Sequence, residues 1–222
     1  MFQNFFYKYF LIVSLIFLYS CSSKEKTIFA EPKKIIPLER LYALAYQNFE
    51  DQNYKDAVKL FEEIEKNYSF NAQWASKSLL MRGYIYYNSS RYVESLEILK
   101  KFKTRFAGNK NIDYVEYLMA MCLFEQINII ALSQESTLLA ERQFKKIISN
   151  YPASKYAEDS KFKLDLIQDQ LAGKEMYVAR YYMKRAKWGP ALVRLNNVVK
   201  YYQTTVYIEE ALHRLVEIHY KL

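Results

Sequence analysis

The chain lacks the residue patterns by which enzymes and metal proteins are recognised. Its two histidines, His213 and His219, are six residues apart and cannot share one face of a helix. His213 and Glu217 are four apart, but two ligands do not define a metal site. No serine or cysteine stands at a recognisable spacing from a base, and the four glycines form no phosphate-binding loop. Adjacent carboxylates such as Glu209 and Glu210 point apart around a helix and are expected to be solvated. We therefore expect no catalysis, no bound metal and no non-covalent cofactor.

Two further absences concern the fold and the membrane. No segment alternates apolar and polar residues for long enough to predict a β-sheet. The apolar run Phe10–Tyr19 has about ten residues, whereas a helix that spans a bilayer needs about twenty. With Lys8 as the only charge in the first twenty residues, this run has the length expected of a signal peptide. We predict a signal peptide at residues 1–20.

The end of that run resembles the lipobox of bacterial lipoproteins. Leu18-Tyr19-Ser20-Cys21 has an aliphatic residue, a small residue and then the cysteine that would carry the lipid. By the same resemblance, Ser22 after the cysteine implies sorting to the outer membrane. Residues 21–37 hold Pro32 and Pro37 among lysines and glutamates and are predicted to be a lipidated flexible tether. The alternative is an ordinary secretory signal followed by a chance cysteine.

Charge and cysteine content restrict the partners of an exported chain. The net charge is +8, and removal of residues 1–20 takes away only Lys8, which leaves +7. Export excludes nucleic acid as a partner and leaves acidic lipid head groups, lipopolysaccharide or acidic protein surfaces. The charges are scattered along the predicted helices rather than clustered, which favours a mostly solvated surface over a charged partner. With Cys21 acylated, Cys122 has no disulfide partner and is predicted to be a buried structural thiol.

One pattern occurs four times along the chain. A small residue is followed by apolar residues four and seven positions later and by an aromatic residue eleven positions later. These offsets follow one face of an α-helix, so each copy predicts the buried stripe of an amphipathic helix. Their recurrence predicts stacked helical hairpins that form an all-α superhelical solenoid of about five tetratricopeptide-like helix pairs. The copies are Ala57-Phe61-Ile64-Tyr68, Ser95-Leu99-Phe102-Phe106, Ala140-Phe144-Ile147-Tyr151 and Ala191-Leu195-Val198-Tyr202.

Ten helices are expected from Leu38 onward. Gly173 is taken as a boundary between two of them, and Gly83 is expected inside a helix where close packing needs a missing side chain. With this division the last tetratricopeptide-like copy is one helix out of phase with the earlier ones. The expected ranges are about 38–50, 54–68, 72–88, 92–106, 111–129, 135–150, 154–172, 174–187, 189–202 and 206–221.

The ordered phrases of the chain, behind the lipobox, resemble the BamD family of outer-membrane assembly lipoproteins. The matching phrases run over the whole mature length. They include Tyr54-Lys55-Asp56-Ala57, Tyr84-Ile85-Tyr86-Tyr87, Asn111-Ile112-Asp113-Tyr114-Val115, Asn150-Tyr151-Pro152-Ala153-Ser154-Lys155-Tyr156, Asp169-Gln170-Leu171-Ala172 and Val178-Ala179 with Tyr181-Tyr182, Arg185 and Trp188.

The resemblance implies a scaffold on the periplasmic face of the outer membrane. Residues 153–222 would form the complex-binding half, in which Arg194 and Arg185 contact the barrel protein BamA. Residues 38–152 would form the client-binding half, and other assembly lipoproteins and unfolded outer-membrane proteins would be further partners. Tyrosines on the first helices, which line the concave side of such superhelices, would hold the client. They are Tyr42, Tyr46, Tyr84, Tyr87, Tyr114 and Tyr117.

Several alternatives stay open at this point. Each tyrosine could simply pack in the core, and each arginine could be a solvated surface residue. The segment 127–132 is short and apolar where the family commonly has a longer acidic one, so it could be a contact or part of the core. A tetratricopeptide lipoprotein that organises peptidoglycan enzymes is the second candidate function, and a peptidoglycan hydrolase is a distant third.

Overall fold

The computed structural model describes residues 36–127 and 134–222, and this part of the chain is entirely helical between its turns. The predicted signal peptide, Cys21, all of the tether before Ile36 and most of the segment 127–132 lie outside the described residues. No strand occurs in the described part, which confirms the all-α class. Its helices are α2 (Leu38–Glu50), α3 (Tyr54–Asn67), α4 (Ala72–Asn88), α5 (Tyr92–Arg105), α6 (Ile112–Phe124), α7 (Glu135–Asn150), α8 (Lys155–Met183), α9 (Trp188–Tyr201) and α10 (Ile208–Lys221).

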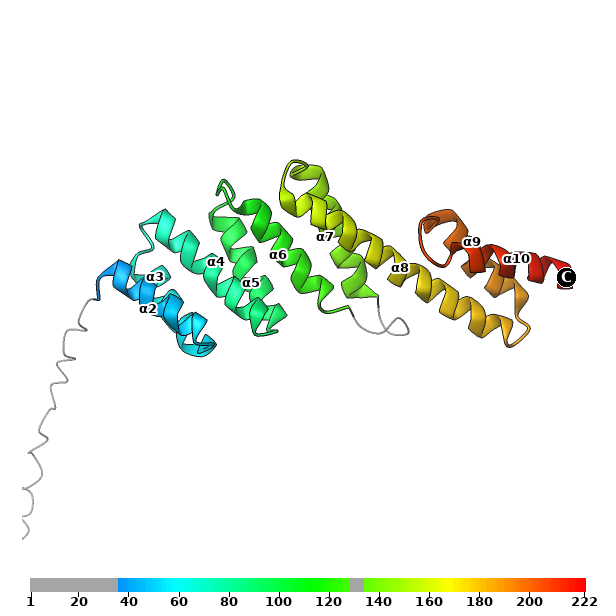
Figure 1. Ribbon diagram of the computed structural model, residues 1–222, viewed down its shortest axis with the longest axis horizontal. Coiled ribbons are helices and arrows are strands. Elements are labelled where there is room, and N and C mark those ends of the chain that lie inside the picture. The colour runs from blue at the N-terminus through cyan, green and yellow to red at the C-terminus, as the bar shows by residue number, and fades with distance from the viewer. Residues whose placement is uncertain (1–35, 128–133) are drawn as a thin grey trace, which may run out of the picture. The chain divides into compact units, whose positions relative to one another are not determined.

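Each helix packs mainly against the helices before and after it in the chain. Figure 1 shows this succession from α2 to α10. The first helices of neighbouring pairs also touch, since α4 contacts α6 and α6 contacts α8. This nearest-neighbour packing confirms a tetratricopeptide-like solenoid. The pairs are α2/α3, α4/α5, α6/α7 and α8/α9, and α10 follows as a single helix.

The fourfold pattern lies on the second helix of every pair, namely α3, α5, α7 and α9. In each copy the small residue and both apolar residues are fully buried. The aromatic residue is the C-cap of its helix in all four copies. Its backbone angles are similar in each copy, with φ between −120° and −132° and ψ between 31° and 53°. Burial of each large side chain contributes about 1.5–3 kcal/mol. The pattern thus predicts correctly which face of these helices is inside.

The expected boundary at Gly173 is wrong, because α8 runs without a break for 29 residues. Gly173 is buried in the middle of the helix beside Leu171 and Ala172, so packing on both sides compensates for the low helix propensity of glycine. Two expected helices are therefore one. The merger leaves nine helices in the described part and puts the last copy of the pattern in phase with the others.

The helix expected at 111–129 is also shorter than predicted, because α6 ends at Phe124. The side-chain amide of Gln126 donates a hydrogen bond of 2.6 Å to the carbonyl of Cys122. This bond satisfies one of the carbonyls that a helix end leaves without a partner. The local side chain therefore stops the helix before the apolar segment begins.

Three of the pairs are closed by the same tight turn. Gln52, Ser90 and Ala186 each have a positive φ, of 59°, 58° and 53°. In each turn the next residue donates a backbone hydrogen bond to the carbonyl five residues earlier, as Lys187 does to Tyr182. This is the Schellman arrangement, in which glycine is usually preferred at the left-handed position. The chain builds it with other residues.

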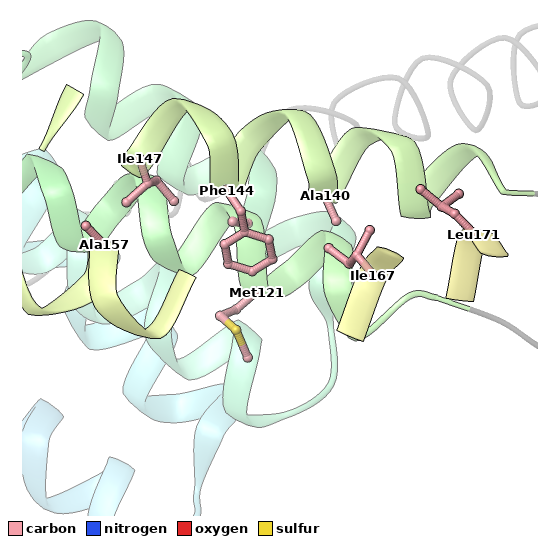
Figure 2. Packing of buried hydrophobic residues seen from close by; sticks show 8 residues of the cluster. Met121, Ala140, Phe144, Ile147, Ala157, Ile167 and Leu171 are labelled. Atoms are coloured by element: carbon pink, nitrogen blue, oxygen red, sulfur yellow. The ribbon is translucent and has the colours of Figure 1, made fainter. Parts of the chain in front are cut away.

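The core is divided into clusters, each of which is built from three successive helices. Figure 2 shows Phe144 and Ile147 of α7 packed with Met121 of α6 and Ile167 of α8. The close approach expected at Gly83 is also present, since a Cβ atom there would lie 2.6 Å from Cδ2 of Leu99.

α8 joins two of these clusters. Its first part packs on α6 and α7, and its second part packs on α9 and α10 through Met176 and Ala179. Cys122 is buried and free, as predicted. Its thiol donates to the hydroxyl of Ser95 at 3.2 Å, and burial raises the pKa of the thiol to about 11. The thiol is therefore neutral and inert at physiological pH.

Candidate interaction surfaces

The candidate client tyrosines lie on the first helices α2, α4 and α6, as predicted, but their surroundings differ. Tyr42 is half-buried against Phe61 and Trp74, with ring centroids 5.4 and 5.1 Å away. Tyr46 is 45% exposed. Tyr84 contacts Phe49 at 5.7 Å, which links α4 to α2. Tyr42 is thus mainly a packing residue, whereas Tyr46 is open to solvent.

A fourth first helix extends this aromatic face through Tyr156, which the sequence reasoning did not select. The ring centroid of Tyr156 on α8 lies 5.1 Å from that of Tyr114. The Tyr156 ring is also stacked on the ring of Tyr117, with the centroids 5.0 Å apart. The hydroxyl of Tyr117 donates to Asp159 at 2.6 Å. Tyr156 stands in the first turn of α8, much as Tyr114 does in α6. This equivalent position in the two helices could have identified Tyr156 from the sequence.

Burial raises the pKa of three phenols of this face, Tyr87, Tyr114 and Tyr117. It raises the pKa of Tyr87 to about 12, with Glu125 and Tyr92 as further causes. The pKa values of Tyr114 and Tyr117 are raised as well, mainly by burial, and for Tyr117 also by its hydrogen bond to Asp159. Tyr87, Tyr114 and Tyr117 therefore offer apolar rings and uncharged hydroxyl groups at physiological pH.

The candidate partner residue Arg194 is held by a carboxylate of its own chain. Its Nη1 donates to both oxygens of Glu175 on α8, at 3.0 and 3.4 Å. Asn197, one turn further along α9, donates to the same carboxylate at 2.9 Å. The side chain of Arg194 is nevertheless 41% exposed. Glu175 orients a guanidinium group that a partner can still reach.

Arg185 lies elsewhere in the same half, in the turn between α8 and α9. Its guanidinium group stacks on the ring of Tyr181, 3.8 Å from the centroid. Tyr181 itself is 46% exposed and contacts Tyr182 edge-on. The two arginines predicted as partner contacts therefore belong to separate clusters on α8 and α9, each oriented by a neighbouring side chain.

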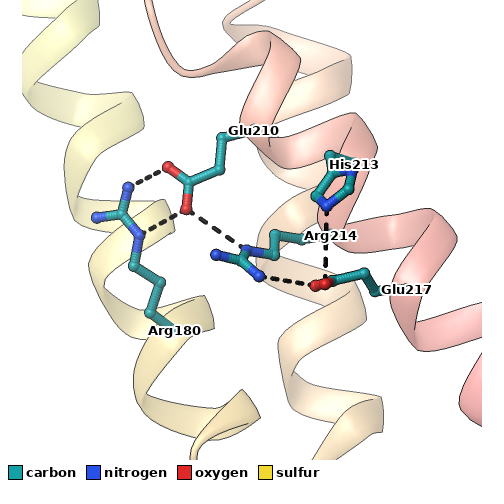
Figure 3. A network of polar contacts seen from close by, with 5 residues as sticks. All are labelled: Arg180, Glu210, His213, Arg214 and Glu217. Atoms are coloured by element: carbon teal, nitrogen blue, oxygen red, sulfur yellow. Dashed lines mark hydrogen bonds and ion pairs between the residues drawn. The ribbon is translucent and has the colours of Figure 1, made fainter.

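A polar network joins α8 to α10 (Figure 3). Arg180 of α8 makes a two-pronged contact with Glu210, through Nε at 2.9 Å and through Nη2. Arg214 lies between Glu210 and Glu217 and bonds the latter at 2.8 Å. Glu210, expected to be solvated, is about one third exposed (32%) and is also paired with Arg180 of α8.

The sequence reasoning also missed two buried carboxylates in the first half of the chain. Glu65 of α3 contacts Arg82, Lys101 and Arg105, at 2.6, 2.6 and 2.7 Å. Glu65 is eight residues after Ala57, so it lies on the face that the fourfold pattern marks as buried, and this offset was the available signal.

The second buried carboxylate is Glu116 of α6. It is bonded by Lys103 at 2.6 Å, by Lys146 at 3.4 Å and by Gln143. Burial by itself would raise the pKa of Glu116, but its contacts with Lys103 and Lys146 lower that pKa below its ordinary value of 4.5. Glu116 is therefore ionised at physiological pH and joins α5, α6 and α7.

Two searches of the described residues bear on other kinds of site. Across 36–127 and 134–222, no three or more histidine, cysteine, aspartate or glutamate side chains gather where they could hold a metal ion. None of the helices from α2 to α10 combines the length and the apolar character that crossing a bilayer requires. His213, the one candidate with a neighbouring carboxylate, is paired with Glu217 at 3.7 Å.

Comparison with known proteins assigns the family. Residues 36–222 match the model of the family described as YfiO, outer membrane lipoprotein. The chain is 35% identical to the outer membrane protein assembly factor BamD of Caulobacter vibrioides, over 89% of this chain and 64% of that protein. It is 33% identical to the proteins of the same name from Rickettsia prowazekii and Neisseria gonorrhoeae, over 93% and 83% of this chain and 80% and 72% of theirs. The chain therefore belongs to the YfiO/BamD family.

Proposed function

We propose that this chain is a lipid-anchored scaffold that takes part in the assembly of outer-membrane proteins. The observation that carries the proposal is the family match over residues 36–222, together with relatives that are named outer membrane protein assembly factors. A solenoid of helix pairs suits this role, since it presents several helix faces to different partners at once.

In this proposal the second half of the chain binds the periplasmic part of BamA. Arg194 supports it best, because Glu175 holds one of its nitrogens while the side chain is still 41% exposed. A guanidinium group that is already oriented loses less conformational entropy when it grips a second carboxylate. Arg185 would contribute a second contact from the turn between α8 and α9.

The first half would bind unfolded clients along its aromatic face. Tyr46, Tyr84 and Tyr114 supply aromatic rings and hydroxyl groups, which suit extended segments that alternate apolar and polar residues. The chain would be anchored in the outer membrane, on its periplasmic side, by a lipid at Cys21.

A capture experiment tests the complex. Tagged full-length chain, solubilised in detergent, is probed for BamA beside Arg194→Ala, Arg185→Ala and the matched control Arg142→Ala on α7. We expect capture by the wild type and the control, and weakened capture by both test variants. Equal capture by all four proteins would exclude the arginine contacts but keep the complex. Capture of peptidoglycan enzymes in place of BamA would overturn the proposed function.

The anchor is tested separately by Cys21→Ser. We expect this variant to move from the membrane fraction to the soluble periplasmic fraction, because it has lost its acyl chains. A variant that stays in the membrane fraction would show that protein contacts retain the chain there.

A further inference from the structure

Four cations from α5 and α7 form a basic strip of two groups, one over each of the two buried carboxylates of the first half. This basic strip consists of Lys101, Lys103, Arg105 and Lys146. Lys101 and Arg105 are one helical turn apart and share one oxygen of Glu65.

The strip continues through the second carboxylate. Lys103 of α5 and Lys146 of α7 share one oxygen of Glu116. Lys103 is two positions from Lys101 and from Arg105, so it lies on the opposite flank of α5, and the two groups of cations stand on either side of that helix. The strip therefore runs from the edge of α3 across α5 to α7.

The two glutamates under the basic strip are buried, whereas the four cations of the strip are partly exposed. Glu65 and Glu116 are 7% and 2% exposed, whereas the four cations are between 35% and 49% exposed. A partner in solvent thus meets the ammonium and guanidinium groups first. Burial of the carboxylates hides the charges that would otherwise cancel the field of the strip.

The cations also outnumber the acids that hold them. Glu116 faces two lysines, and the proximity of Lys103 is the main cause that lowers the pKa of Lys146. Glu65 faces Arg82 in addition to Lys101 and Arg105, and Glu62 lies 3.8 Å from Arg82 as a second acid. Positive charge is thus left over at both ends of the strip, and a further anion would relieve the crowding.

We propose that the basic strip binds the head groups of anionic phospholipids. An extended row of cations fits a flat anionic surface, and each lysine or arginine near such a surface adds to membrane affinity. The choice of a membrane rests on the proposed function, in which the chain is held at the outer membrane. One acyl anchor combined with a basic patch is a general route to stable membrane attachment.

The test measures how far each lysine is protected from acetylation, by mass spectrometry of the full anchored chain. One sample is reconstituted in vesicles of phosphatidylglycerol and phosphatidylcholine, and the other in phosphatidylcholine alone. We expect several-fold slower modification of Lys101, Lys103 and Lys146 on the anionic vesicles. The protection should disappear at about 0.5 M salt, since screening shortens the reach of surface charges. Equal rates on the two kinds of vesicle overturn the proposal.

Variants and a second probe sharpen the result. In Lys101→Gln/Lys146→Gln each buried glutamate keeps a cation, so the fold is retained, and Lys103 should lose its protection. The matched pair Lys184→Gln/Lys187→Gln, which removes the same charge from the turn before α9, should leave Lys103 protected. Loss of Lys103 protection in both double variants would overturn the assignment of lipid binding to the strip. Protection by soluble polyglutamate but not by anionic vesicles overturns it in favour of an acidic protein.

Failure of this proposal can be distinguished from failure of the proposed function. Sedimentation before labelling shows whether the chain is anchored, and a soluble chain contradicts the anchor at Cys21. In that case the same labelling is carried out with vesicles added to the soluble chain. BamA capture by Lys101→Gln/Lys146→Gln should equal that of the wild type, because the strip lies in the other half of the solenoid.

Discussion

The two halves of the solenoid are held together by different kinds of charge contact. From α2 to α7, two buried carboxylates are each surrounded by cations from neighbouring helices. From α8 to α10, the corresponding contacts are half-exposed pairs, such as Arg180 with Glu210. The first half is built from short helices of 13 to 17 residues, whereas the second depends on the 29-residue helix α8.

Buried and half-exposed ion pairs differ in what they contribute to stability and in how easily a partner can reach them. A buried ion pair contributes through its geometry and is costly to break on one side, and salt screens it little. A half-exposed pair contributes about 0–1 kcal/mol and is weakened by salt. The acids of the first half therefore hold the fold, while arginines of the second half, such as Arg194, can be shared with a partner at low cost.

The largest effect is expected from Glu65→Ala, which removes a buried carboxylate of the first half. It would leave the guanidinium group of Arg82, which is 8% exposed, without its carboxylate at 2.6 Å. We expect a loss of about 3–5 kcal/mol in the free energy of unfolding, measured by urea denaturation. The control Glu62→Ala removes a carboxylate that is 61% exposed and should cost less than about 1 kcal/mol. Equal losses in the two variants would refute the distinction.

Gly173→Pro tests the role of α8 as the link between clusters. Proline removes a backbone hydrogen bond and clashes with the preceding turn, which costs about 3 kcal/mol or more. We expect the single thermal transition of the wild type to split into two, observed by calorimetry, because the core on α9 and α10 loses its connection. Lys155→Pro is the control, since it places proline at the first position of the same helix after the extended residue Ser154. A single transition in both variants would argue against the link.

Glu210→Gln tests the half-exposed network by pH and salt. Arg180, and then Arg214, lower the pKa of Glu210 below its ordinary value of 4.5. A carboxylate with a lowered pKa stabilises the fold above its ordinary pKa, and the stabilisation is lost as the pH falls through the lowered value. The difference in unfolding free energy from the wild type should be about 0–1 kcal/mol at pH 7 and vanish in strong acid. It should also shrink in high salt, and a difference that salt leaves unchanged would contradict this account.

The smallest effect is expected at a feature that both halves share, the turn with a positive φ. Ala186→Gly should stabilise the chain by about 0.5–1 kcal/mol, because an alanine side chain is strained at a φ of 53°. The same substitution at Ala43, exposed within α2, should instead destabilise it by a similar amount. Thermal denaturation of the two variants gives the sign of each change. Destabilisation by both would mean that the turn is not strained.

Much of the fold can be read from the sequence because the buried faces repeat at a fixed spacing. The fourfold pattern identifies the buried residues of α3, α5, α7 and α9, and their C-caps follow from the terminal aromatic residues. The helix boundary expected at Gly173 is wrong because the low helix propensity of glycine favours a break there by only about 1 kcal/mol. Burial of Leu171 and Met176 on either side contributes more than that.

The candidate surfaces could be predicted only in part. The tyrosines of the first helices follow from the repeat, since each occupies a comparable place in its pair. The partners of the charged residues do not, because the residues that meet are far apart in the chain: Glu65 and Arg105 are separated by 40 positions, and Arg194 and Glu175 by 19. Many lysines and arginines are equally plausible partners in the sequence alone.

The amino-acid sequence by itself determined the helical class, the repeated units and the buried stripe of each second helix, because all of these depend on local periodicity. Only the tertiary structure decided that α8 is continuous, that Glu65 and Glu116 are buried beneath cations, and that Arg194 is oriented by Glu175. Charge contacts act across space with no fixed sequence spacing, so their arrangement emerges only when the helices are packed.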